Sequence, residues 1–82
     1  MRLALFVKSL CWGCQEWERV LEERGLSVKI YDIDENFVAR EYIQKMHCGQ
    51  VPVLRDEDSR IEFEGFQEDA AQEFLLSLAE GE

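Results

Sequence analysis

The stretch "RLALFVKSLCWGCQEWERVLEERG", residues 2–25, decides the fold of this 82-residue chain. It begins with a short apolar run, Leu3–Val7, of the kind that forms a strand buried on both faces of a sheet. From Trp12 to Arg24 apolar residues recur at helical spacing against a face of glutamates, and Gly25 follows, where a helix C-terminal glycine belongs. The stretch therefore predicts a strand followed by an amphipathic helix with two cysteines at its start.

The rest of the chain shows the same two periodicities. In chain order, the pattern predicts a strand over 26–34, a helix over about 35–47, a short strand over 50–54, a polar turn over 55–60, a strand over 60–66 and a last helix that contains Ala71, Phe74, Leu75 and Leu78. The order βαβαββα gives parallel strands first and an antiparallel hairpin later. We expect one α/β domain over residues 1–82, a four-stranded mixed sheet flanked by three helices.

The charge of the chain limits its partners. Eighteen acidic residues against nine lysines and arginines give a net charge of −9 at pH 7, which repels nucleic acid and anionic lipid surfaces. No apolar stretch approaches the roughly 20 residues that span a bilayer, and the N-terminal apolar run is too short for a secretion signal. We expect a cytoplasmic monomer that binds proteins or small molecules, without nucleic-acid or membrane binding.

Two of the three cysteines, Cys11 and Cys14, stand two residues apart at the predicted helix start. A reducing compartment makes a structural disulfide improbable there, so the pair indicates catalysis or metal binding. Helix N-terminal amides, with Lys8 nearby, favour a thiolate at Cys11. Cys11 is then the nucleophile that attacks a disulfide, and Cys14, one helical turn on, resolves the mixed disulfide.

The alternative for this pair is a metal or iron–sulfur site. With His47 and Cys48, the two cysteines would supply three thiolates and one imidazole, a plausible tetrahedral set by ligand type. Adjacent His and Cys are not the usual separated second ligand pair. We therefore favour the redox interpretation, with neither a metal nor another cofactor bound.

Three segments together resemble a known family. "MRLALFVKSLCWGC" (1–14), "GQVPVL" (49–54) and "EGFQED" (64–69) resemble the glutaredoxin branch of the thioredoxin fold, most closely the NrdH-type redoxins. The resemblance implies a thioredoxin-like fold and a dithiol oxidoreductase that reduces protein disulfides. It also implies thioredoxin reductase or glutathione as electron donor, and ribonucleotide reductase as a protein that the redoxin would serve.

The resemblance also assigns a substrate-binding surface. It implies a cis bond before Pro52, which keeps the main chain of Val51 open to an extended peptide near Cys11. Trp12, between the cysteines, either contacts a substrate protein or folds onto nearby apolar surface. The expected substrate-binding residues are Lys8, Trp12, Gly13, Gln50, Val51, Pro52, Gly65 and Phe66.

The electron donor is predicted from one replacement. Where glutathione-binding relatives carry a Gly-Gly pair, this chain has Glu64 and Gly65, which adds a side chain and a negative charge. We therefore expect thioredoxin reductase to be the better donor, with a glutathione-dependent glutaredoxin as the alternative.

Three further residues are interpreted from their position in the predicted helices. Trp17 shares the apolar face of the first helix and should lie in the core. Cys48 is either a small buried apolar residue or a redox-sensitive extra thiol. We interpret His47 as a helix-end cap or surface residue.

Overall fold

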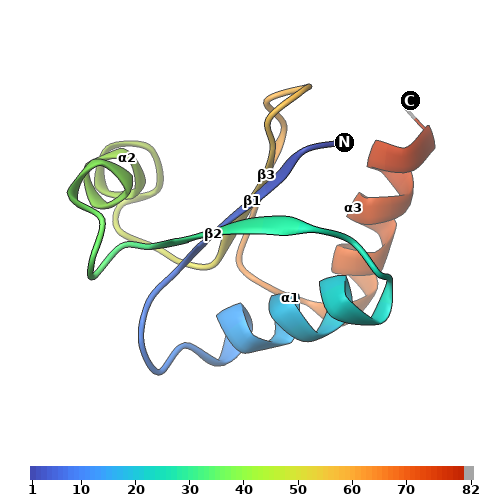
Figure 1. Cartoon of the computed structure of the whole chain (residues 1–82), viewed down its shortest axis with the longest axis horizontal. Helices are drawn as coiled ribbons and strands as arrows, with labels where there is room; N and C mark the ends of the chain where they lie inside the picture. Colours follow the sequence, from blue (N-terminus) through green and yellow to red (C-terminus); the bar gives the residue numbers. More distant parts are fainter. Residues whose placement is uncertain (81–82) are drawn as a thin grey trace.

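The computed structural model describes residues 1–80, which form a four-stranded mixed sheet and three helices (Figure 1). In chain order the elements are β1 (Leu3–Val7), α1 (Trp12–Glu23), β2 (Val28–Asp32), α2 (Phe37–His47), β3 (Val53–Asp56), β4 (Glu62–Glu64) and α3 (Glu68–Glu80). The order matches the predicted βαβαββα. None of these helices is both long enough and apolar enough to cross a membrane.

The sheet has the strand order β2-β1-β3-β4. β1 runs parallel to β2, with Leu3 opposite Val28, and antiparallel to β3, which in turn pairs antiparallel with β4. All five residues of the central strand β1 are buried, which confirms the prediction of a strand covered on both faces. Because β1 leads directly into α1, the cysteines lie at the carboxyl end of this central strand.

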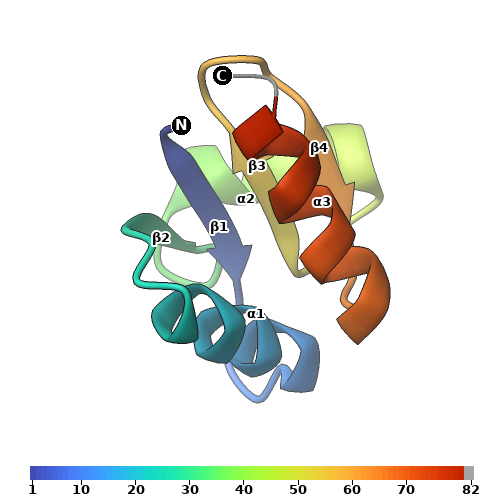
Figure 2. The ribbon, with the colours of Figure 1, turned by 90° about the vertical axis from the view of Figure 1, so that its right-hand side faces the viewer.

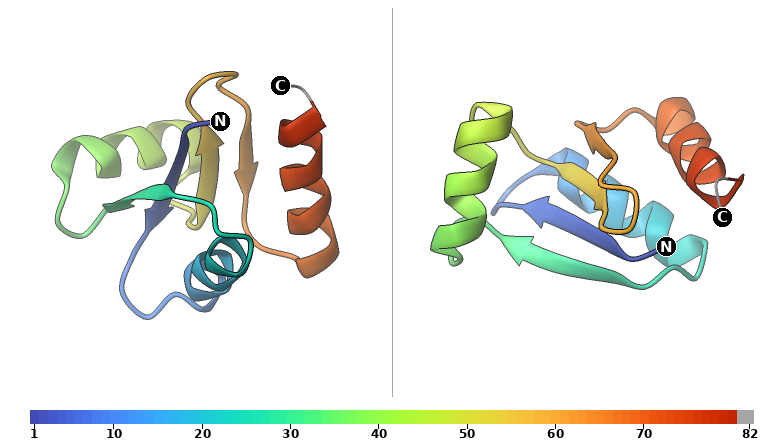
Figure 3. Two further views of the ribbon diagram at one scale, coloured as in Figure 1. Left: turned by 45° about the vertical axis from the view of Figure 1, so that its right-hand side comes forward. Right: turned by 90° about the horizontal axis from the view of Figure 1, so that it is seen from above.

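Two hydrophobic clusters separate the helices onto opposite faces of the sheet. Leu5 packs with α1 and α3 on one face, whereas its neighbour Phe6 packs under α2 on the other. Figures 2 and 3 show this layering, with α2 across the sheet from α1 and α3. Trp17, on α1, is fully buried and packs toward α3, so the predicted core position is confirmed.

The boundaries differ from the prediction at the hairpin. The sequence assigned Asp56 to the polar turn, but Asp56 ends β3 and is buried. Its carboxylate accepts hydrogen bonds from the amides of Arg2 and Asp58 and from the Ser59 hydroxyl, and these bonds offset the cost of burying the charge. The second helix begins at Phe37 rather than at 35, and Gly81, expected near the end of the last helix, lies outside the described residues.

Candidate active site

Cys11 and Cys14 form a disulfide at the start of α1, with Cα atoms 5.2 Å apart. Cys11 is the N-cap of the helix, and its Sγ accepts a hydrogen bond from the backbone amide of Cys14 at 3.2 Å. Cys11 is 9% exposed and Cys14 only 2% exposed. Of the two sulfur-bearing side chains, that of Cys11 is therefore the more accessible.

The position of Cys11 has an electrostatic consequence. The first amides of a helix lack intrahelical acceptors and carry the positive end of the helix dipole. The Cys14 amide points at Cys11 Sγ, so after reduction the same contact would stabilise a thiolate at Cys11. Cys14 lies inside the first turn, and in the described part of the chain, residues 1–80, its sulfur receives no corresponding cap contact.

Pro52 forms one wall of the site. Its peptide bond with Val51 is cis, as the resemblance implied, and its ring is buried. Gly13 faces this ring so closely that a Cβ on residue 13 would lie 3.0 Å from Pro52 Cδ. Within residues 1–80 the backbone of Val51 makes no hydrogen bond, so both its N–H and its C=O remain open to a ligand.

Gly65 and Phe66 form a second wall. The Gly65 amide donates to the carbonyl of Pro52 at 2.7 Å, and the Gly65 carbonyl accepts from Trp17 Nε1 at 2.7 Å. The Phe66 ring meets Trp17 edge to face, with centroids 5.5 Å apart, and meets Trp12 at 5.9 Å. The sequence placed Trp17 in the core, but it gave no signal that its indole anchors the Gly65 loop.

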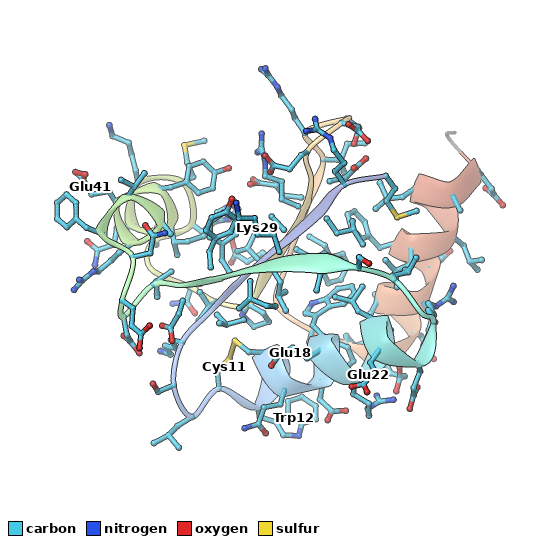
Figure 4. The ribbon with its side chains drawn as sticks, viewed as in Figure 1. Cys11, Trp12, Glu18, Glu22, Lys29 and Glu41 are labelled. Carbon is cyan, nitrogen blue, oxygen red and sulfur yellow. A yellow bond between two sulfur atoms is a disulfide. The ribbon has the colours of Figure 1, made fainter. Side chains whose placement is uncertain are left out.

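The remaining predicted substrate-binding side chains are exposed. Trp12 is 67% exposed, and Figure 4 shows it pointing outward from the start of α1, away from the sulfur of Cys11. Lys8 and Gln50 are exposed as well, and within residues 1–80 Lys8 forms no ion pair. The fold thus brings Cys11, Trp12 and the Pro52 loop to one end of the molecule.

One residue beside the cysteines was missed. Leu10, directly before Cys11, is 99% exposed and has a positive φ of 56°. Bulky residues rarely adopt this left-handed conformation, and no sequence pattern indicates it. In the sequence, Leu10 followed by Cys11 indicates the end of an apolar strand and not a turn.

His47 connects α2 to β4. Its Nε2 lies 2.9 Å from a carboxylate oxygen of Glu62, and its Nδ1 lies 2.7 Å from one of Glu64. Two carboxylates can both be bound only when both ring nitrogens carry protons. Burial lowers the pKa of His47, but the hydrogen bonds to Glu64 and Glu62 outweigh burial and raise that pKa above its ordinary value.

Both ring nitrogens of His47 are engaged by Glu62 and Glu64. Among residues 1–80, no group of three or more His, Cys, Asp or Glu side chains is arranged to hold a metal ion. The fold therefore does not assemble the alternative ligand set of Cys11, Cys14, His47 and Cys48. His47 is a bridge between two elements, which is more than the helix-end cap or surface residue that we expected.

Cys48 is not buried. It ends α2 in a left-handed conformation with φ 52°, and its free thiol is exposed. The interpretation of Cys48 as a small buried residue is therefore wrong, because the helix-ending turn carries it out of the apolar face of α2. The interpretation as an extra reactive thiol stays open.

A hollow of about 330 Å³ lies across the sheet from the cysteines. Phe6, Tyr31, Val38 and Tyr42 contribute to its lining, and the cysteines do not. The candidate active site is thus an accessible surface at the helix start, which suits a substrate as large as a protein.

Comparisons with known proteins agree with this geometry. The family model described as Glutaredoxin matches residues 3–60. A solved structure of the glutaredoxin-like protein NrdH-redoxin from Escherichia coli, described as having a thioredoxin-like activity profile, is 25% identical with a TM-score of 0.76, covering 89% of this chain and 93% of that one. The glutaredoxin from Archaeoglobus fulgidus shares the fold at 22% identity and a TM-score of 0.71, covering 90% and 85% of the two chains. A search of curated proteins gives no significant match.

Proposed function

Because the chain belongs to the glutaredoxin family, we propose that it is a dithiol oxidoreductase that reduces protein disulfides in a reducing compartment such as the cytoplasm. The observation that carries the proposal is the helix-capping position of Cys11, whose sulfur faces the Cys14 amide beside the open backbone of Val51. The protein would act as a single domain and as a monomer, without a cofactor.

The reaction proceeds in two exchanges. The Cys11 thiolate attacks one sulfur of a substrate disulfide, so that a mixed disulfide forms and the other substrate sulfur leaves as a thiolate. The Cys14 thiol then loses its proton and attacks Cys11 Sγ, which releases the second substrate thiolate. Two electrons pass from the dithiol to the substrate, and the redoxin is left with its Cys11–Cys14 disulfide.

The two cysteines differ in ways that support these roles. Cys11 has the more accessible side chain and receives the helix-start amide, whereas Cys14 is almost fully buried. A buried thiol cannot reach an external disulfide, but it can reach the neighbouring sulfur once a mixed disulfide has formed. Cys11 is therefore the nucleophile and Cys14 the resolving residue.

Substrate would bind across the Pro52 loop. The unpaired N–H and C=O of Val51 can pair with an extended peptide beside the attacked disulfide, as an added strand does at a sheet edge. Gly65 and Phe66 complete this surface from the other side, held in place by Pro52 and Trp17. Lys8 and Gln50 lie exposed, available to polar groups of the substrate.

We propose thioredoxin reductase as the electron donor in preference to glutathione. Glu64 stands where glutathione-binding relatives have a glycine, and its side chain is joined to that of His47 at 2.7 Å. This pairing weakens the charge repulsion between Glu64 and glutathione that the sequence suggested, because a protonated His47 partly neutralises the Glu64 carboxylate. The two side chains still occupy space at that position, and the thioredoxin-like activity profile described for the Escherichia coli NrdH-redoxin points to the same donor.

A coupled assay tests the donor. NADPH oxidation is followed with thioredoxin reductase or with glutathione and glutathione reductase, at equal redoxin concentration and with the same protein disulfide. We expect the thioredoxin reductase arm to be faster, and Glu64→Gly to raise the glutathione rate, whereas Glu57→Gly, a turn acid elsewhere, leaves it unchanged. Efficient glutathione coupling with no response to thioredoxin reductase would make the protein a glutathione-dependent glutaredoxin.

The physiological substrate is proposed from the resemblance to NrdH-type redoxins. It implies that the protein donates electrons to a ribonucleotide reductase. Capture of that enzyme by the Cys14→Ser variant from cell extract, released by dithiothreitol, would support the assignment, whereas its absence among the captured proteins would contradict it.

A further inference from the structure

Leu10 combines two unfavourable features at one position. It is the most exposed of the large apolar side chains in residues 1–80, at 99%. Its φ of 56° is left-handed, a conformation that glycine adopts readily and leucine only rarely. The left-handed backbone costs stability, and the exposed side chain adds none of the stabilisation that burial would give. Within the described residues, the Leu10 side chain makes no contact that compensates for this cost.

The turn that carries Leu10 is held in place. The amide of Ser9 donates to the carboxylate of Asp34 at 3.2 Å, and the amide of Asp34 donates to the carboxylate of Asp32 at 2.8 Å. In the same region the amide of Ile33 donates to the carbonyl of Val7 at 2.9 Å. The loops after β1 and β2 therefore brace each other, and Leu10 projects from a supported turn rather than from a loose loop.

Trp12 presents a second apolar side chain on the other side of Cys11. Residues 10 and 12 are separated by a single residue, so their Cα atoms are at most about 7 Å apart. The indole is 67% exposed, yet Phe66 supports one side of it with centroids 5.9 Å apart. The two exposed side chains thus flank the proposed nucleophile in the sequence and are both fixed at their base.

We propose that Leu10 and Trp12 bind an apolar side chain next to the attacked cysteine of a protein substrate, and that Leu10 sets this specificity. The inference rests on the proposed function of Cys11. Leu10 and Trp12 are the chain neighbours of Cys11 on either side, so they are the exposed apolar residues nearest in sequence to the sulfur that a substrate disulfide must reach. Glutathione offers no apolar side chain to them, which makes a protein or peptide the matching occupant.

Single-turnover reduction of two peptides tests the proposal. The fully reduced redoxin, which needs no donor, is mixed with disulfide-linked peptides that differ only in the residue beside the cysteine, Phe in one and Ser in the other. We expect wild type to prefer the Phe peptide by about tenfold, the scale expected for burying one large apolar side chain. Leu10→Gly should remove most of this preference.

The stability of Leu10→Gly provides a second readout. Glycine relieves the left-handed strain, so the melting temperature should stay the same or rise by up to about 5 °C while the preference falls. A loss of preference accompanied by unfolding would point to a structural role and would overturn the assignment.

Two controls are matched to Leu10. Arg60→Gly removes a left-handed residue in the remote hairpin, with φ 66°, and Leu76→Ser removes an exposed leucine on α3. Both should keep the wild-type peptide preference.

The outcomes separate the two proposals. Reduction of neither peptide by wild type would contradict the proposed function itself. Reduction of both peptides at equal rates, or an unchanged preference in Leu10→Gly, would overturn the role of Leu10 and leave the dithiol chemistry intact.

Discussion

Gly13 lies against the ring of Pro52, and a Cβ added to residue 13 would be 3.0 Å from Pro52 Cδ and 3.2 Å from Cγ. Phe66 Cβ closes the same space at 3.4 Å. The glycine between the cysteines therefore lets the start of α1 approach the loop that forms the wall of the site. The identity of residue 13 is a packing requirement as well as part of a motif.

Gly13→Ala should destabilise the protein by about 1–2 kcal/mol, because a methyl group in this contact overpacks a site whose neighbours are held in place. Helix propensity alone predicts the opposite sign, since Ala is favoured over Gly by about 1 kcal/mol within a helix. Urea unfolding measures the difference. Gln15→Ala, at an exposed position of the same helix, serves as control and should change the stability by less than about 0.5 kcal/mol. A stabilised Gly13→Ala would show that Pro52 yields easily.

Trp17→Phe should destabilise the protein by about 2–3 kcal/mol. The change removes the hydrogen bond from Nε1 to the Gly65 carbonyl and leaves a space among Phe63, Phe66 and Phe74. Chemical denaturation measures the loss, with Trp12→Phe as the exposed control that should stay near wild type. Equal effects of the two substitutions would argue against an anchoring role of Trp17.

The His47 bridge predicts a pH dependence of stability. Because hydrogen bonding raises the folded-state pKa of His47 above its unfolded value of about 6.5, the bridge contributes fully below that pH and is lost as pH rises through the folded pKa. A protonated imidazole between two carboxylates is the charged state that this bridge requires, so the contribution is greatest in mildly acidic solution. His47→Gln should therefore cost about 1 kcal/mol near pH 6 and less by pH 9.

Unfolding free energies of wild type and His47→Gln at several pH values from 6 to 9 measure this difference. The comparison cancels titrations that the two proteins share. A stability difference that stays constant across this range would show that Glu62 and Glu64 do not stabilise the protonated form of His47.

The sequence was sufficient where the deciding interactions are local. β1 and α1 were predicted because a buried run and a helical stripe each repeat over a few residues, and Trp17 belongs to that stripe. The thioredoxin-like arrangement followed from the order of the elements and from the resemblance. The predicted hairpin boundary was wrong because an aspartate at position 56 indicates a turn. In the structure Asp56 is buried, and hydrogen bonds that include one from Arg2, 54 residues away, compensate for the burial of its charge.

The parts of the site that were missed depend on distant partners or on backbone conformation. The bond from Trp17 to Gly65 joins residues 48 apart, and no local pattern encodes it. The bridge from His47 to Glu62 and Glu64 exists only after α2 and β4 have packed. Leu10 and Cys48 adopt left-handed conformations that their residue types disfavour, so sequence preferences predict the wrong exposure for Cys48 and no turn at Leu10.

The central claim is that Cys11 attacks and Cys14 resolves, and trapping the mixed disulfide tests it most directly. In a Cys48→Ala background, which removes the exposed third thiol, reduced Cys14→Ser is mixed with a protein disulfide and analysed by intact mass and peptide mapping. We predict a stoichiometric adduct on Cys11 that dithiothreitol releases, and no adduct with Cys11→Ser in the same background. An adduct on Cys14 in Cys11→Ser, or full turnover by Cys11→Ser, would contradict the account.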